Sequence, residues 1–147
     1  MALSVMTSER YQVELDVLNS KLSPNLFRFR DVDGPAPNLV IAVRTNRGNV
    51  YTLYFDLQGF PDSGPPKVFV TRMLRTRSGE EMSGCSAPMC TLPSEHGWTR
   101  IRHYDGASWT STVSLYKIYV ISRLWLVMYE LHLQNGRPLA HYLNHED

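Results

Sequence analysis

Cys90 is the residue of this 147-residue chain whose type and setting best suit covalent chemistry. A thiolate is a strong nucleophile, and a thioester formed on it keeps enough energy to pass its acyl group onward. Pro88 and Pro93 favour irregular, accessible backbone around the thiol over burial within a helix or strand. Nearby cations would lower the pKa of the thiol. The candidates are His96, Arg100, Arg102 and His103. A small buried cysteine without chemistry is the alternative interpretation.

Three other chemical interpretations use the same stretch of sequence. Cys85 is a competing nucleophile, since its Ser, Gly and Ala neighbours are typical of a flexible exposed loop. A zinc site would join both cysteines to His96 and His103, but the gaps of four, five and six residues do not match a zinc finger. A cysteine peptidase would pair the thiol with His96 or His103 and orient that ring through Asp105. No peptidase signature surrounds Cys90, so acyl carriage is favoured.

Composition and charge narrow the classes of protein. With 43% hydrophobic and 20% charged residues, the chain is expected to form a single domain over residues 1–147. A net charge of +1 gives no field that would attract nucleic acid or an anionic membrane surface. The longest apolar stretch, Val113–Leu133, contains Lys117, Arg123, Glu130 and His132, so it predicts a core helix and no membrane span. The first six residues lack the pattern of a secretory leader, and we expect a protein of the cytoplasm.

Two helices are expected, one near each end of the chain. Apolar residues at helical spacing follow the capping residues Thr7 and Ser8, and Pro24 stops that helix. A second and longer helix is expected to be capped by Ser108, to start at Trp109 and to end at Gly136.

Four consecutive strands are expected between these helices, because β-branched and aromatic residues alternate between turn signals. They are Leu26–Arg30, Leu39–Thr45, Val50–Leu57 and Lys67–Thr71. Residues 72–106 lack sustained periodicity and predict a long functional loop, although Arg100 and Arg102 around Ile101 are also typical of the wet face of a short strand. The order predicts an α+β fold with helices packed on or beside an antiparallel sheet.

One segment and one spacing resemble the ubiquitin-conjugating enzymes. Residues 60–70, FPDSGPPKVFV, resemble the turn and fourth strand of that family, in which an aromatic-Pro pair precedes a Pro-Pro-Lys-Val step. The family also carries a Trp eight residues beyond its catalytic cysteine, as Trp98 lies beyond Cys90 here. The order of helix, strands and helix extends the resemblance over nearly the whole chain. It implies an N-terminal helix, a four-stranded antiparallel meander, a long active-site loop and a long C-terminal helix, and it selects Cys90 over Cys85 as the nucleophile.

The chain also departs from that family. Ubiquitin-conjugating enzymes usually carry a His-Pro-Asn triplet before the cysteine, and this sequence has no Asn between Asn49 and Asn135. The distance from the Pro-Pro-Lys step to the cysteine is about four residues longer than in typical eukaryotic members. His96, His103, Thr91 or backbone N–H groups would have to replace the missing amide.

This divergent form is similar to bacterial ubiquitin-conjugating-like proteins of antiphage operons, including cyclic-oligonucleotide-based signalling systems. The resemblance implies a transferase in which Cys90 carries a protein C-terminus as a thioester and passes it to an acceptor, without a cofactor or metal. The implied partners are a cGAS-like nucleotidyltransferase or a ubiquitin-like protein, together with an activating enzyme. A non-catalytic scaffold of the same fold, which only binds such a partner, is the alternative.

Overall fold

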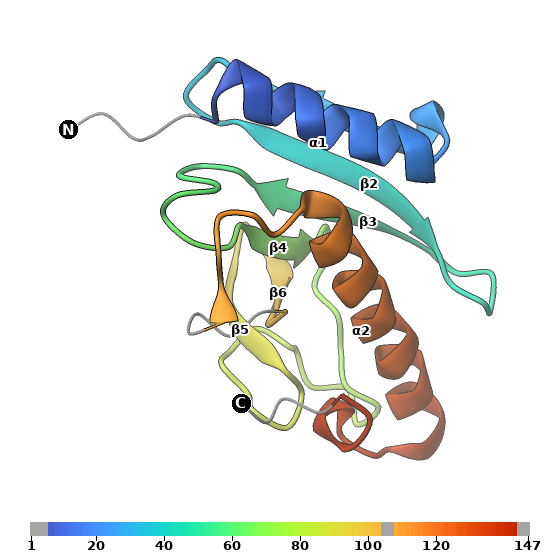
Figure 1. The fold of residues 1–147 in the computed structure, drawn as a ribbon. Helices are drawn as coiled ribbons and strands as arrows, with labels where there is room; N and C mark the ends of the chain where they lie inside the picture. The colour runs from blue at the N-terminus through green and yellow to red at the C-terminus, as the bar shows by residue number, and fades with distance from the viewer. Residues whose placement is uncertain (1–5, 104–107, 144–147) are drawn as a thin grey trace.

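The fold is that of a computed structural model, which describes residues 6–103 and 108–143. Two α-helices accompany a six-stranded antiparallel sheet whose strand order is β1-β2-β3-β4-β6-β5 (Figure 1). The helices are α1 (Ser8–Lys21) and α2 (Leu115–Asn135), with short 3-10 turns η1 (Pro24–Leu26) and η3 (Leu139–His141). The strands are β1 (Phe27–Arg30), β2 (Asn38–Arg44), β3 (Val50–Asp56), β4 (Lys67–Val70), β5 (Thr91–Glu95) and β6 (Trp98–Ile101). The α+β class is therefore confirmed.

The four expected strands form a meander in chain order, close to the predicted ranges. β2 and β3 pair over their full lengths, from Asn38 opposite Asp56 to Arg44 opposite Val50. Because side chains alternate across a strand, Leu39, Ile41 and Val43 of β2 face the helices and are buried. The hydrophobic alternation thus fixes which face of the meander is covered.

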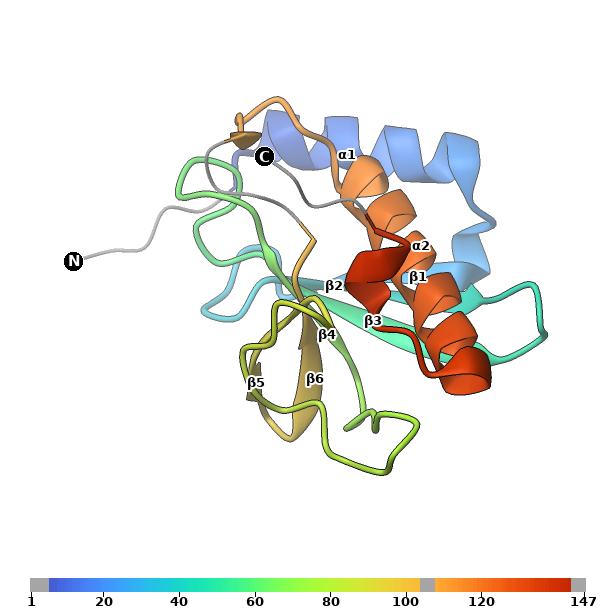
Figure 2. The same ribbon diagram turned by 90° about the horizontal axis from the view of Figure 1, so that it is seen from below.

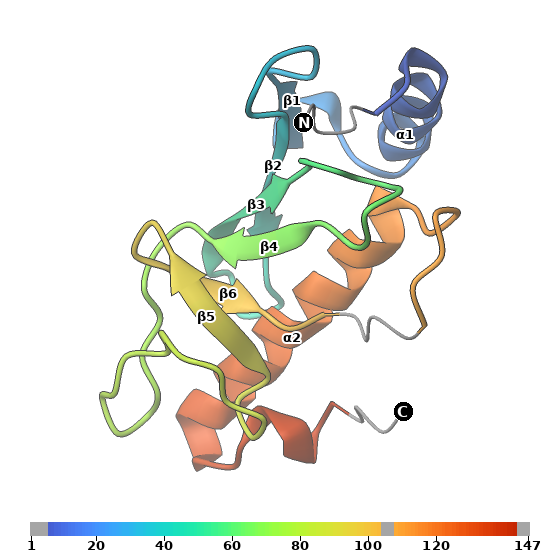
Figure 3. The same cartoon turned by 90° about the vertical axis from the view of Figure 1, so that its left-hand side faces the viewer.

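The predicted long loop is wrong in its second part, where β5 and β6 form a hairpin. His96 and Gly97 both have positive φ, 60° and 75°, and link Glu95 to its partner Trp98. Such a two-residue turn matches the twist of the flanking strands. β6 then pairs with β4, with Phe69 opposite Arg100, and the sheet gains two strands over the expected four (Figure 3).

The start of the long helix is also corrected. α2 begins at Leu115, and its N-cap is Ser114, whose hydroxyl accepts a hydrogen bond from the N–H of Lys117 at 3.1 Å. Trp109 lies outside the helix and donates from Nε1 to the carbonyl of Pro61 at 3.1 Å. The predicted C-terminal end is confirmed, because Gly136 takes the left-handed conformation that closes a helix.

Both helices lie on one side of the sheet, where a single core forms (Figure 2). α1 contributes Leu18 to it, and α2 contributes Ile118, Trp125 and Leu126. α2 crosses the sheet and runs past the irregular segment 71–90 that joins β4 to β5 (Figures 1 and 3). Within the described residues, no helix has the length and apolar character needed to cross a membrane.

Candidate functional site

Cys90 is the last residue of a tight turn that leads directly into β5. Its φ is 55°, in the left-handed region that non-glycine residues seldom adopt. The N–H of Cys90 donates to the carbonyl of Ala87 at 3.3 Å, and the thiol sulfur lies 3.7 Å from the same oxygen. The turn therefore fixes the direction in which the thiol points.

The carbonyl of Cys90 is held from two directions. The backbone N–H of Arg102 donates to it at 3.0 Å, and Nε1 of Trp125 donates to it at 2.9 Å. Arg102 follows β6 and Trp125 lies in the middle of α2. The site is thus assembled from the turn, the end of the hairpin and the long helix.

The same face of α2 holds the rest of the irregular segment. The hydroxyl of Tyr129 donates to the carbonyl of Arg75 at 2.7 Å, and Nε2 of His132 accepts from the N–H of Arg77 at 3.0 Å. Together with Trp125, these side chains recur at steps of four and three residues, which places them on one face of the helix. Sequence reasoning missed all three, although this spacing of polar-tipped aromatic residues was visible in the sequence.

The C-terminal 3-10 turn closes over the other side of the Cys90 turn. The N–H of Ala140 donates to the carbonyl of Pro88 at 2.9 Å, and Leu139 beside it is completely buried. Leu139 and Leu143 belong to the same buried cluster as Cys90. The turn that carries the thiol is therefore held by the residue after β6, by α2 and by η3.

The predicted accessibility of Cys90 is wrong in this conformation, since its exposed fraction is 0%. Burial raises the pKa of the thiol, and the charge of Arg102 acts in the opposite direction. Cys85 is exposed, as its flanking residues predicted. It lines a pocket of about 230 Å³ together with Glu80, Glu81 and Ser86.

His96 lies far from Cys90, which contradicts its predicted supporting role. It stands at the tip of the hairpin, with its ring centroid 5.3 Å from that of Trp98 and 6.2 Å from that of Phe69. β5 separates the tip of the hairpin from Cys90. At the usual rise of a strand, this distance is roughly 15–20 Å. Of the four predicted cations, Arg102 is the one that acts on the thiol's pKa.

His103 follows Arg102 and joins the two halves of the sheet. Its Nε2 donates to the carbonyl of Pro66, just before β4, at 2.8 Å. Burial lowers the pKa of His103 to about 4; the hydrogen bond to Pro66 acts in the opposite direction, and the charge of Arg100 adds a smaller lowering. At neutral pH the imidazole of His103 is uncharged and is a weak proton acceptor. It therefore cannot lower the pKa of the Cys90 thiol as a cation, and any supporting role would be that of a neutral ring.

Arg100 belongs to β6 on the face of the sheet away from the helices, which confirms the strand interpretation of this residue. Its guanidinium lies 4.0 Å from Glu95, which also pairs with Lys67 at 2.8 Å. Thr91 is buried, and its hydroxyl donates to the carbonyl of Gly84 at 2.7 Å, so it holds the loop in place. Asp105, the predicted orienting residue of a peptidase, lies outside the described residues.

No family model, curated protein or solved structure matches this chain. The chemistry of the site therefore rests on its own residues. Within residues 6–103 and 108–143, no three side chains of His, Cys, Asp or Glu come together as a metal-ligand set. The two cysteines and two histidines of the zinc interpretation do not form such a set.

Proposed function

We propose that this chain is a ubiquitin-conjugating-like transferase that carries a protein C-terminus as a thioester on Cys90. The supporting observation is the fixed turn at Cys90, whose carbonyl accepts hydrogen bonds from Arg102 and Trp125. Such fixed geometry suits a group that must present one atom to a reactive carbonyl carbon. The expected Trp98, eight residues further on, lies in the strand that follows the hairpin turn.

The proposed chemistry consists of two acyl transfers. The Cys90 thiolate attacks the carbonyl carbon of an activated C-terminus, a new C–S bond forms, and the leaving group departs with its electron pair. An acceptor amine then attacks the thioester, loses a proton, and expels the Cys90 thiolate. Arg102 favours the thiolate both when it attacks the donor and when the acceptor amine expels it, because the charge of Arg102 lowers the pKa of the thiol.

The partners follow from the resemblance. The acyl donor would be a cGAS-like nucleotidyltransferase or a ubiquitin-like protein, delivered by an activating enzyme in the cytoplasm of a bacterium that uses the system against phage. Because Cys90 has no exposed surface, the donor would have to displace the residues that cover the thiol. The C-terminal turn, joined to Pro88 through Ala140, is the segment whose movement would do this.

A non-catalytic scaffold is the second candidate function. The complete burial of Cys90 and its raised pKa favour it, since a buried thiol with little thiolate is usually inert. In this case the domain would bind the partner without forming a covalent bond.

A thioester assay separates the two functions. The chain is incubated with the activating enzyme and the nucleotidyltransferase or ubiquitin-like protein encoded next to its gene, with ATP, and the products are run on non-reducing gels. The transferase produces a thiol-sensitive adduct that is lost in Cys90→Ala and kept in Cys85→Ala. An adduct with the opposite dependence would move the nucleophile to Cys85, and binding without any adduct would favour the scaffold.

The reactivity of the thiols can be measured without a partner. Iodoacetamide labelling followed by mass spectrometry gives the rate for each cysteine in the folded chain. We expect Cys85 to react at least about tenfold faster than Cys90, because only Cys85 is exposed. Addition of the authentic acyl donor should raise the rate at Cys90, whereas a scaffold would leave it unchanged.

A further inference from the structure

A groove on the outer side of α2 is independent of the Cys90 site. It has a volume of about 510 Å³ and lies between the end of α1, the turn after β2 and the outward face of α2. Its apolar lining consists of Leu22, Tyr116, Tyr119, Val120, Leu124 and Val127. Asn46 and Arg123 supply the polar part of the lining.

The floor of the groove is an exposed apolar stripe on a helix. Val120 is 45% exposed and Leu124 is 47% exposed, and together with Tyr116 they recur every four residues. This spacing places them in one row along the helix. The opposite face of α2 is buried in the core, so this row is a second apolar face that residues 6–103 and 108–143 leave exposed.

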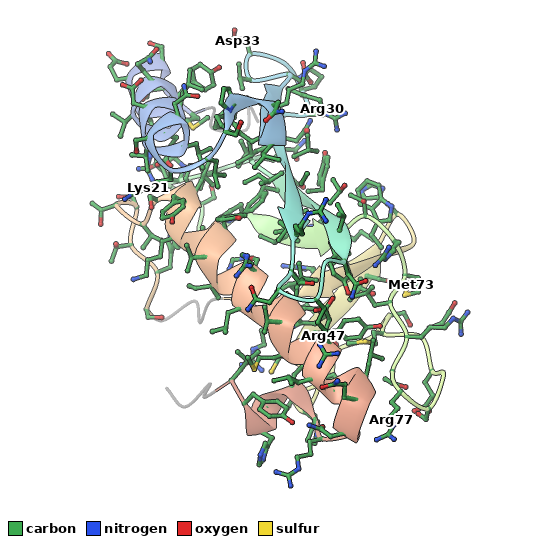
Figure 4. All side chains as sticks on the ribbon, turned by 90° about the vertical axis from the view of Figure 1, so that its right-hand side faces the viewer. Lys21, Arg30, Asp33, Arg47, Met73 and Arg77 are labelled. Carbon is green, nitrogen blue, oxygen red and sulfur yellow. The ribbon has the colours of Figure 1, made fainter. Side chains whose placement is uncertain are left out.

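Three cationic side chains of the described residues, Lys21, Arg47 and Arg123, lie at or beside the groove. Nζ of Lys21 lies 5.8 Å from the ring centroid of Tyr116, and the guanidinium of Arg123 reaches the turn after β2, where it donates to Asn46 at 3.2 Å. Figure 4 shows Lys21 at the end of α1 and Arg47 on that turn. Within the described residues, none of these three cations forms a salt bridge.

No carboxylate of α2 offsets these charges. Glu130 is the single acidic residue between Leu115 and Asn135, and it is 4% exposed. Its carboxylate faces inward and accepts hydrogen bonds from Thr45, Asn49 and Tyr51. An apolar row with an uncompensated basic rim therefore complements an apolar ligand with acidic flanks.

We propose that this groove binds an acidic amphipathic helix of a partner protein. The row from Tyr116 to Val127 spans about 16 Å at the rise of an α-helix, which corresponds to a partner helix of about three turns. Leucine-type side chains of the partner lie on Val120 and Leu124, and its carboxylates lie beside Lys21 and Arg123. A helix suits the site better than a strand, because the groove offers side chains and no open strand edge.

A designed peptide pair tests the proposal. One fluorescein-labelled peptide of about 14 residues has leucines at helical spacing with flanking glutamates, and its counterpart has lysines in place of the glutamates. Fluorescence anisotropy measures the affinity of each peptide for the full chain at low and high salt. We expect the acidic peptide to bind at least about tenfold more tightly than the basic one, with an affinity that falls as salt rises.

Variants of the groove and a matched control locate the binding. Leu124→Asp and Arg123→Glu should each lower the affinity for the acidic peptide about tenfold. Arg123→Glu should also raise the affinity for the basic peptide. Leu133→Asp is the control, since Leu133 is 40% exposed on the same helix but does not line the groove. Circular dichroism confirms that each variant is folded.

Four results would overturn the proposal. The first two are equal affinity of the chain for both peptides and no binding of the acidic peptide up to about 1 mM. The third is a loss of affinity in Leu133→Asp as large as that in Leu124→Asp. The fourth is a wild-type dimer in sedimentation that Leu124→Asp converts to a monomer. The last result would assign the groove to a second copy of this chain.

Discussion

The meander β1–β4 and the irregular segment 71–90 are held against α2 in different ways. The meander has its own ladder of backbone hydrogen bonds and adds alternating apolar side chains to the core. The irregular segment relies on polar groups of α2, in which Trp125, Tyr129 and His132 each bond to its backbone. The conformation of the Cys90 turn therefore depends on one face of a helix more than on its own sequence.

α2 holds the meander through a buried polar cluster of another kind. Glu130 gathers three donors from β3 and the turn before it onto a single carboxylate oxygen: Thr45 at 3.0 Å, Asn49 at 2.7 Å and Tyr51 at 2.9 Å. Burial and the nearby Glu130 raise the pKa of Tyr51, so the phenol stays protonated and remains a donor. A carboxyl group of α2 thus holds the meander, whereas an indole, a phenol and an imidazole of the same helix hold the irregular segment.

Replacement of Glu130 should lower the free energy of unfolding more than any other change considered below. In Glu130→Ala, three donors lose their acceptor in a buried site, and we expect the free energy of unfolding to fall by about 3–5 kcal/mol. Urea denaturation measures this loss. Glu130→Gln keeps an oxygen acceptor, so its free energy of unfolding should fall less than that of Glu130→Ala. Equal stability of wild type and Glu130→Ala would show that the cluster contributes nothing to the meander.

His103, which links the residues after β6 to Pro66 before β4, should make the free energy of unfolding depend on pH. The folded state keeps this ring neutral down to its pKa of about 4, whereas the unfolded chain protonates it near 6.5. As the pH falls through this window the unfolded state binds more protons, so the free energy of unfolding decreases, by up to about 3 kcal/mol. Above pH 6.5 the contribution is constant.

Comparison with His103→Gln isolates this contribution, because glutamine can still donate to Pro66 and does not titrate. Urea denaturation between pH 4 and 7 should give a steeper pH dependence for wild type than for the variant. Parallel curves would contradict the prediction.

Trp125→Phe should loosen the Cys90 turn. The variant loses the donor to the Cys90 carbonyl and leaves space in the core, and we expect a loss of about 2 kcal/mol. The more specific expectation concerns labelling. Iodoacetamide should react several-fold faster with Cys90 and at an unchanged rate with Cys85. A similar increase at both cysteines would indicate general unfolding instead.

Tyr129→Phe should lower the free energy of unfolding least, by about 1 kcal/mol, because it removes one hydrogen bond to the exposed residue Arg75. Limited proteolysis should cut more rapidly between residues 72 and 82 while the meander keeps its hydrogen-exchange protection. Faster exchange in β2 and β3 would mean that the two regions are not held separately.

Local signals in the sequence were enough for the elements of the meander and for the ends of the helices that carry strong caps. Thr7, which accepts a hydrogen bond from the N–H of Arg10, and Gly136, with its positive φ, act within a few residues of their own position. The start of α2 was misplaced because Ser108 and Ser114 offer the same local signal. Packing of Trp109 on Pro61, 48 residues away, decides against the earlier start.

The sequence by itself determined that two cysteines and a cluster of basic residues share one stretch, and tertiary structure decided which of them meet. The β5–β6 hairpin has a register shift between Leu92 and Glu95, so Thr91 pairs with Ile101 and Arg102 comes next to Cys90, while His96 remains at the tip. Burial of Cys90 likewise depends on Trp125, 35 residues away, and on the C-terminal turn. Contacts across such separations leave no periodic trace in a single sequence, because they arise when the chain closes around one core.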